Sequence, residues 1–293
     1  MFSGSFVALV TPMLPDGEID YKGLEQLVSF HLQQGSDGLV IMGTTAEAAT
    51  ISFPEQLEII ARVAGQVSGQ IPVLAGNGTN ATAEGVARTR QLDKLAIDGF
   101  LTVTPFYNKP MQKGLLAHFQ QVAAATAKPV LLYNVPGRTG VDLLPETVAE
   151  LATTANIVGI KEATGSLARL AELQQRCPAD FALFSGDDAT SLAFMQAGGH
   201  GVISVTANVA PALLARLCRL ARSGQTEEAQ TLDDMLQGLH HQLFIESNPI
   251  PTKWALQRMA LIESDFIRLP LTQLEPIHHG TIEQALQQAG LQF

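Results

Sequence analysis

The chain has 293 residues, of which 46% are hydrophobic and 16% are charged, and its net charge is −10. This balance excludes disordered and fibrous proteins, and the lack of any Lys/Arg run argues against partners such as nucleic acid or an acidic membrane. The length suits one barrel of about 250 residues with an extra piece, or two ordinary domains.

Eight short apolar runs recur along the chain, and each ends in small or polar residues before a segment with helical character. They cover residues 6–10, 38–42, 72–75, 100–103, 130–133, 157–161, 181–184 and 201–205. Runs that are apolar on both faces are typical of parallel strands buried on both sides.

The segments between these runs have the pattern of helices. Residues 21–34 carry apolar side chains close to a 3.6-residue period. Residues 55–67 follow Ser52-Phe53-Pro54, which combines a capping residue with an early proline. After about residue 225 the strands stop, and three further helices are expected at 226–245, 251–261 and 281–289.

A series of eight strand–helix units favours an α/β fold of the (β/α)8 TIM-barrel type. Periodicity alone leaves an open, doubly wound sheet as the alternative. We predict a catalytic barrel over residues 1–224 and a C-terminal helical extension over 225–293, without a low-complexity linker between them.

The N-terminus and the two cysteines favour a cytoplasmic protein. The first residues lack the basic region and the cleavage site of a signal peptide, and no apolar run is long enough to span a membrane. Cys177 and Cys218 form no CxxC pair, so neither a disulfide framework nor a zinc site is expected.

Lys161 is the most unusual strand residue, because it closes the apolar run Ile157-Val158-Gly159-Ile160. Alternation places it on the same face as Gly159, which would leave space beside it. Burial disfavours the charged ammonium, and a neutral amine can attack a ketone to form a Schiff base. The plainer alternative is a surface lysine that extends out of the strand end into solvent, or one paired with a nearby carboxylate such as Glu162.

Other polar residues follow the ends of neighbouring runs. Thr44 and Thr45 offer hydroxyls and turn amides that could hold a carboxylate, although the same residues also make an ordinary turn. Tyr133 ends the fifth run, where a phenol can relay protons. Tyr107 and Arg138 lie in loops, and a guanidinium can clamp a carboxylate, unless it only forms a surface ion pair.

The remaining motifs are weak. Gly76-Asn77-Gly78 lacks the rest of a dinucleotide fingerprint, and the adjacent pairs His240-His241 and His278-His279 have poor spacing for ligands on one helix face. We therefore expect no metal and no cofactor.

Five motifs in register resemble the dihydrodipicolinate synthase branch of the pyruvate aldolase superfamily, over nearly the whole chain. They are Pro105-Phe106-Tyr107-Asn108-Lys109-Pro110, Tyr133-Asn134-Val135-Pro136, Gly159-Ile160-Lys161-Glu162, Gly186-Asp187-Asp188 and Gly201-Val202-Ile203-Ser204. The resemblance implies condensation of pyruvate with aspartate semialdehyde to 4-hydroxy-tetrahydrodipicolinate, on the diaminopimelate route to lysine.

The resemblance also implies a role for each matched residue. Lys161 would form the Schiff base, Tyr133 and Thr44 would relay protons, and Tyr107 would complete the relay across a dimer interface. Thr44 and Thr45 would hold the pyruvate carboxylate through turn donors, and Arg138 would hold that of the second substrate, while Gly186 and Ile203 would shape the pocket. A homotetramer built from two tight dimers is implied as well.

The chain departs from the family pattern in two respects. Ala46 replaces a glycine after Thr44-Thr45, so we predict that its backbone needs no positive φ. Ala49, Asn80 and Glu84 match a lysine effector site at the tight dimer interface. At that site Phe53, Gln56 and Phe106 replace histidine, histidine and tyrosine, which predicts weak or absent inhibition by lysine.

Two alternatives remain open. Another aldolase of the superfamily, such as N-acetylneuraminate lyase or a 2-keto-3-deoxy sugar-acid aldolase, would share Lys161 and Tyr133, but those branches generally lack an arginine at the place of Arg138. A non-catalytic barrel that binds a small keto acid would have no need of a nucleophile.

Overall fold

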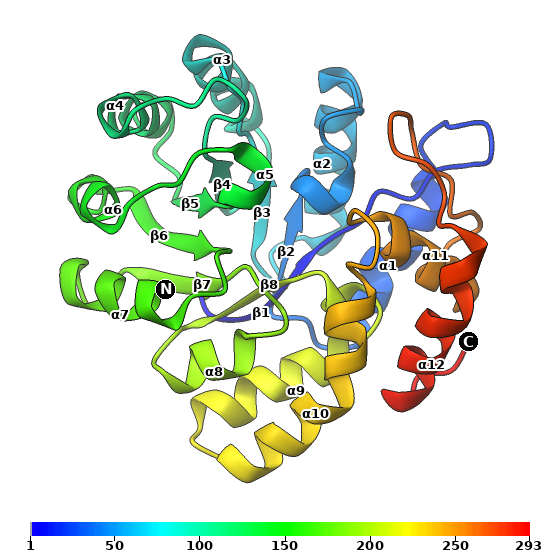
Figure 1. Ribbon diagram of the computed structural model, residues 1–293. Helices are drawn as coiled ribbons and strands as arrows, with labels where there is room; N and C mark the ends of the chain where they lie inside the picture. Colours follow the sequence, from blue (N-terminus) through cyan, green and yellow to red (C-terminus); the bar gives the residue numbers. More distant parts are fainter. Residues whose placement is uncertain (1) are drawn as a thin grey trace.

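The computed structural model describes residues 2–293, and its centre is a closed barrel of parallel strands in the order β1 to β8, with β8 pairing back onto β1 (Figure 1). The strands are β1 (Gly4–Ala8), β2 (Gly38–Ile41), β3 (Val73–Gly76), β4 (Gly99–Val103), β5 (Val130–Asn134), β6 (Ile157–Glu162), β7 (Ala182–Ser185) and β8 (Gly201–Ser204). All eight predicted strands are confirmed, and the closure rules out the open sheet.

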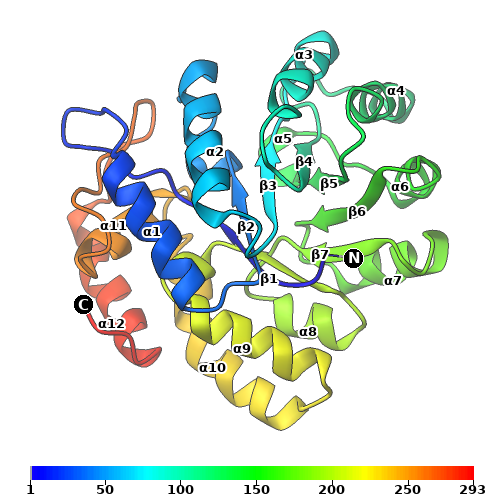
Figure 2. The same ribbon diagram turned by 180° about the vertical axis from the view of Figure 1, so that it is seen from behind.

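Helices surround the barrel on the outside (Figures 1 and 2). They are α1 (Tyr21–Gln33), α2 (Phe53–Val67), α3 (Thr82–Leu92), α4 (Gln112–Ala123), α6 (Pro145–Leu151), α7 (Leu167–Arg176), α8 (Ser191–Gln196) and α9 (Pro211–Arg222). The short helix α5 (Pro136–Thr139) follows β5 and lies inside this ring of helices (Figure 1). The α2 start is capped as expected, because Glu55 Oε2 accepts the backbone N–H of Ser52 at 2.8 Å. Short 3-10 helices η1 (Thr44–Ala46) and η2 (Thr206–Asn208) follow β2 and β8.

The strands separate two apolar layers. The barrel interior is filled by large side chains, among them Phe6, Leu74, Leu131 and Phe184. A second and larger layer lies between the outer face of the strands and the helices. Burial on both faces is the reason that the strands are continuous apolar runs in the sequence.

Beyond α9 the chain forms α10 (Thr226–Gln242), α11 (Ile250–Arg258), the 3-10 helix η3 (Pro276–His278) and α12 (His279–Gln288). The three predicted C-terminal helices are therefore present, each within a few residues of its expected bounds. α10 packs against α8, α9 and α12, and α11 packs against η2 and α12. Treating residues 225–293 as a separate unit stays a prediction.

None of the helices formed by residues 2–293 has the length and apolar character needed to cross a bilayer. Cys177 and Cys218 are free thiols, and burial raises the pKa of Cys177 to about 11.

Candidate active site

Lys161 lies inside the barrel near the carboxyl end of β6 and is only 5% exposed. It is in register with Tyr133 of β5, and its Nζ lies 4.5 Å from the centroid of the Tyr133 ring. The plainer alternative of a surface lysine is therefore wrong. An amine held against an aromatic face in an apolar barrel is shielded from water on that side.

The space beside Lys161 is provided by Gly186, which follows β7. A Cβ at residue 186 would lie 2.8 Å from Cε of Lys161 and 2.6 Å from Cβ of Ala163. The sequence had suggested Gly159 for this purpose. A Cβ at residue 159 would instead collide with the Ala182 carbonyl oxygen on β7, so Gly159 permits close approach of two strands.

The turn Thr44-Thr45-Ala46-Glu47 follows β2 at the same end of the barrel. The first three residues form η1, and the left-handed residue is Glu47, with φ 60° and ψ 33°. Ala46 is helical, and its carbonyl accepts a bond from Thr11 Oγ1 at 2.9 Å. The prediction for Ala46 is confirmed, because the residue that needs a positive φ is the next one along the chain.

Residues from the C-terminal extension hold this turn, and the sequence analysis missed them. Asn248 Nδ2 donates to Thr45 Oγ1 at 2.9 Å. Lys253 Nζ lies 2.7 Å from Glu47 Oε1, with both side chains buried. The available signal was a lysine within Pro251-Thr252-Lys253-Trp254-Ala255, an otherwise apolar part of a helix.

The two loop residues of the expected site lie nearer the surface. Arg138, in α5, is exposed, and its Nη2 approaches the Asn248 carbonyl oxygen at 3.4 Å. Tyr107 has a side chain 87% exposed and a φ of 75°. Its phenol is therefore not packed against Tyr133 of the same chain. Ile203, by contrast, is buried inside the barrel on β8 and is 1% exposed.

A second network lies on the outer side of β5 and β6. Asn134 Nδ2 donates to Asp142 Oδ1 at 2.8 Å and to Glu162 Oε2 at 3.1 Å. Arg169 pairs with Asp142 at 2.6 Å. Burial raises the pKa of Glu162, and the bonds from Asn134 and Thr164 oppose that shift. This network connects the ends of both strands to the loop that follows Arg138.

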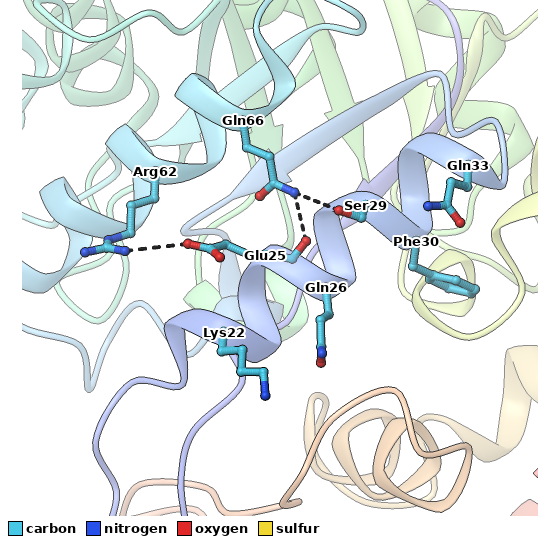
Figure 3. Close-up of a pocket in the computed structure, with 8 residues that line it drawn as sticks. All are labelled: Lys22, Glu25, Gln26, Ser29, Phe30, Gln33, Arg62 and Gln66. Atoms are coloured by element: carbon cyan, nitrogen blue, oxygen red, sulfur yellow. Dashed lines mark hydrogen bonds and ion pairs between the residues drawn. The ribbon is translucent and has the colours of Figure 1, made fainter.

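A groove of about 650 Å³ lies elsewhere, on the outer surface of α1 and α2 (Figure 3). Its polar groups bond to one another: Gln66 Nε2 donates to the Glu25 carbonyl at 2.8 Å and to Ser29 Oγ at 2.9 Å. None of the expected site residues lines it. Within residues 2–293 no three His, Cys, Asp or Glu side chains are grouped so that they could hold a metal ion.

The Dihydrodipicolinate synthetase family model matches residues 1–289 of the chain. The chain belongs to that family. Among its curated relatives, a 4-hydroxy-tetrahydrodipicolinate synthase of Pseudoalteromonas atlantica is 52% identical, with 99% of each chain covered. The Methylococcus capsulatus enzyme of the same name is 54% identical, with 99% of this chain and 100% of the relative covered.

Solved structures of the family agree with the fold. The chloride-inhibited dihydrodipicolinate synthase of Acinetobacter baumannii, complexed with pyruvate, has a TM-score of 0.97 and 45% identity over the whole of both chains. A monomeric variant of the enzyme has a TM-score of 0.97 and 39% identity, covering 99% of this chain and 98% of its own. The predicted family and the predicted TIM barrel are both confirmed.

The residues that the sequence analysis assigned to a possible lysine effector site lie around α2 and α3. Glu84 is paired with Arg88 at 2.6 Å, and the Arg88 guanidinium lies 5.0 Å from the centroid of the Phe53 ring. Gln56 is buried and donates its amide to the carbonyls of Ala48 and Ile51. Ala49 is exposed and Asn80 is half-buried, and the Asn80 carbonyl accepts a bond from Asn108 at 2.8 Å.

Proposed function

We propose that the protein condenses pyruvate with L-aspartate 4-semialdehyde to 4-hydroxy-tetrahydrodipicolinate, through a Schiff base on Lys161. The observation that carries the proposal is the buried amine of Lys161 beside the Tyr133 ring, with room left by Gly186. The names of the curated relatives, more than half identical over the full chain, agree with this activity.

The first half of the reaction follows from the chemistry of the amine. The nitrogen of Lys161 attacks the pyruvate ketone, and the carbinolamine loses its hydroxyl as water to leave an iminium ion. The positive nitrogen acidifies the methyl group, which loses a proton to give an enamine. Tyr133, backed by Thr44, accepts and returns these protons, and the Thr44–Thr45 turn holds the carboxylate through its N–H and hydroxyl donors.

In the second half, the enamine carbon attacks the aldehyde of the second substrate, and the aldehyde oxygen takes up a proton. The amino group of that substrate then attacks the iminium carbon, so that the ring closes and Lys161 leaves as a free amine. Arg138 would hold the carboxylate of the second substrate in a bidentate clamp. Ile203 contributes its backbone carbonyl to the pocket wall.

Borohydride trapping tests the proposal directly. Reduction in the presence of pyruvate should add a stable adduct to Lys161, found by peptide mass spectrometry, and the Lys161→Ala variant should give none. Failure of the native protein to form the adduct would leave only the keto-acid-binding alternative, or no role for pyruvate at all.

The choice of second substrate separates the synthase from the other aldolases. With pyruvate and aspartate semialdehyde, the synthase consumes both and yields a cyclic product. N-acetylneuraminate lyase or a 2-keto-3-deoxy sugar-acid aldolase would instead cleave its own sugar acid to pyruvate. Arg138→Ala should raise the KM for aspartate semialdehyde far more than the KM for pyruvate.

For the assembly, we propose a cytoplasmic homotetramer made of two tight dimers. Tyr107, exposed and with a strained backbone, supports the proposal that its phenol serves the neighbouring subunit. Tyr107→Phe should lower turnover, and sedimentation equilibrium should give the mass of four chains. Unchanged turnover would remove Tyr107 from the relay.

For regulation, we propose that lysine inhibits weakly or not at all. The support comes from Glu84, which already pairs with Arg88, and from Gln56, whose amide donors are used by backbone carbonyls. An incoming amine would have to displace Arg88 from both Glu84 and the Phe53 ring. Half-inhibition of turnover at low-millimolar lysine or below would refute this.

A further inference from the structure

Glu47 and Lys253 form an ion pair with no access to solvent. The Nζ–Oε1 distance is 2.7 Å, and the side chains are 1% and 0% exposed. The partners are 206 residues apart in the sequence: Glu47 closes the turn after β2, and Lys253 lies in α11. The second carboxylate oxygen of Glu47 accepts the backbone N–H of Arg268 at 3.1 Å.

Stability alone is a poor reason for such a pair. The free energy needed to remove two charges from water is about as large as the free energy gained from their attraction. Replacing such a pair by packed apolar residues often leaves the protein as stable or makes it more stable. Burial lowers the pKa of Lys253, and the Glu47 carboxylate opposes that shift. Glu47 also has a left-handed backbone, which is uncommon for a residue with a side chain. Both features indicate a geometric purpose.

The same C-terminal segment contacts the candidate active site at three further points. Asn248 donates to the Thr45 hydroxyl at 2.9 Å, and its backbone carbonyl faces Arg138 at 3.4 Å. The Arg268 side chain bonds the carbonyl oxygen of Thr50 at 3.1 Å, just beyond the turn. Among the hydrogen bonds that join the Thr44–Glu47 turn to distant parts of residues 2–293 through a side chain, all except the bond from Thr11 therefore come from residues 248–268.

We propose that Glu47 and Lys253 are positioning residues, and that their pair fixes the Thr44–Thr45 turn at the place where its donors meet the carboxylate of the first substrate. The helical extension is then part of the pyruvate-binding site, although it contributes no group to the chemistry at Lys161. This inference rests on the proposed function.

Three variants test it: Lys253→Met, Glu47→Gln, and the double variant that carries both. Each should raise the KM for pyruvate at least about tenfold, because a small misplacement of a binding group weakens binding this much. The KM for aspartate semialdehyde should change much less. The half-saturating pyruvate concentration in borohydride trapping should rise in parallel with the KM.

The double variant separates positioning from stability. It leaves no unpaired buried charge, so its urea midpoint should recover relative to the single variants, while its KM for pyruvate stays high. If the KM for pyruvate returned to the native value together with the stability, the ion pair would have only a structural role, and the proposal would be overturned. If none of the three variants is soluble, Asn248→Ala tests the proposal instead. An unchanged KM for pyruvate in the Asn248→Ala variant would overturn the proposal.

Arg258→Met is the matched control. Arg258 also lies in α11 and pairs with Glu283 at 2.8 Å, but this pair is exposed. Its loss should leave both KM values unchanged. Borohydride trapping of the native protein shows which proposal has failed. If the native protein forms no pyruvate adduct, the proposed function is wrong. If it forms the adduct and all variants have the same half-saturating pyruvate concentration, only the positioning role is wrong.

Discussion

Strands β5 and β6 end in two pairs of residues that face opposite ways. Tyr133 and Lys161 are in register inside the barrel, while Asn134 and Glu162 are in register on the outer side. The inner pair meets through the amine and the ring face, with Lys161 Nζ 4.5 Å from the ring centroid of Tyr133. The outer pair is bound into a network with Asp142 and Arg169. Alternation along a strand thus separates the two groups proposed to react from the groups that hold the strand ends.

The largest expected effect is on the inner side. Tyr133→Phe keeps the ring that lies against Lys161 but removes the hydroxyl, so kcat should fall by about 10²- to 10⁴-fold, the usual contribution of a positioned acid–base group. Steady-state kinetics measures this, and Tyr21→Phe in α1 is the control. A kcat near the native value would mean that other groups move the protons.

Gly186→Ala tests the space beside Lys161. The added methyl group would press on Ala163 and on the lysine side chain, so turnover and borohydride trapping should each fall at least about tenfold. Gly65→Ala, a helical glycine with open space around it, is the control and should be neutral for turnover. Normal trapping in the Gly186 variant would show that the lysine has room to move aside.

On the outer side, Glu162→Gln should change stability more than chemistry. Burial raises the pKa of Glu162 in the folded state above its ordinary value of 4.5. The unfolded chain therefore loses this proton first as pH rises, so the native protein should lose stability relative to the glutamine variant above about pH 4.5. Urea unfolding across pH 4 to 7 measures the difference. A difference independent of pH would contradict the raised pKa.

Glu55 should behave in the opposite sense. Its bond to Arg268, at 2.6 Å, lowers its pKa from 4.5 to about 2. The ionised carboxylate therefore stabilises the fold above pH 4.5, and this contribution disappears as pH falls towards 2. Glu55→Gln should remove this part of the stability loss at low pH. Of the substitutions Tyr133→Phe, Gly186→Ala, Glu162→Gln and Glu55→Gln, it should change turnover least. Parallel acid-unfolding curves for the native protein and the Glu55→Gln variant would contradict this contribution of Glu55.

The sequence alone determined the order of strands and helices, the family and the strand-end positions of Lys161 and Tyr133, and it favoured a closed barrel over an open sheet. These features depend on local patterns: apolar runs, helix periodicity, and the rule that barrel chemistry lies at the carboxyl ends of the strands. The motifs around Tyr107, Arg138 and Gly186 were also local, so they could be found without coordinates.

Only the tertiary structure decided which glycine makes room for the lysine, that Glu47 is the left-handed residue of its turn, and that Lys253 and Asn248 hold the turn after β2. The physical reason is separation along the chain. A strand pattern predicts which face a residue occupies, but the atoms that the residue contacts belong to segments up to 206 residues away in the chain. Their distances are set only when the barrel closes and α11 packs against η2.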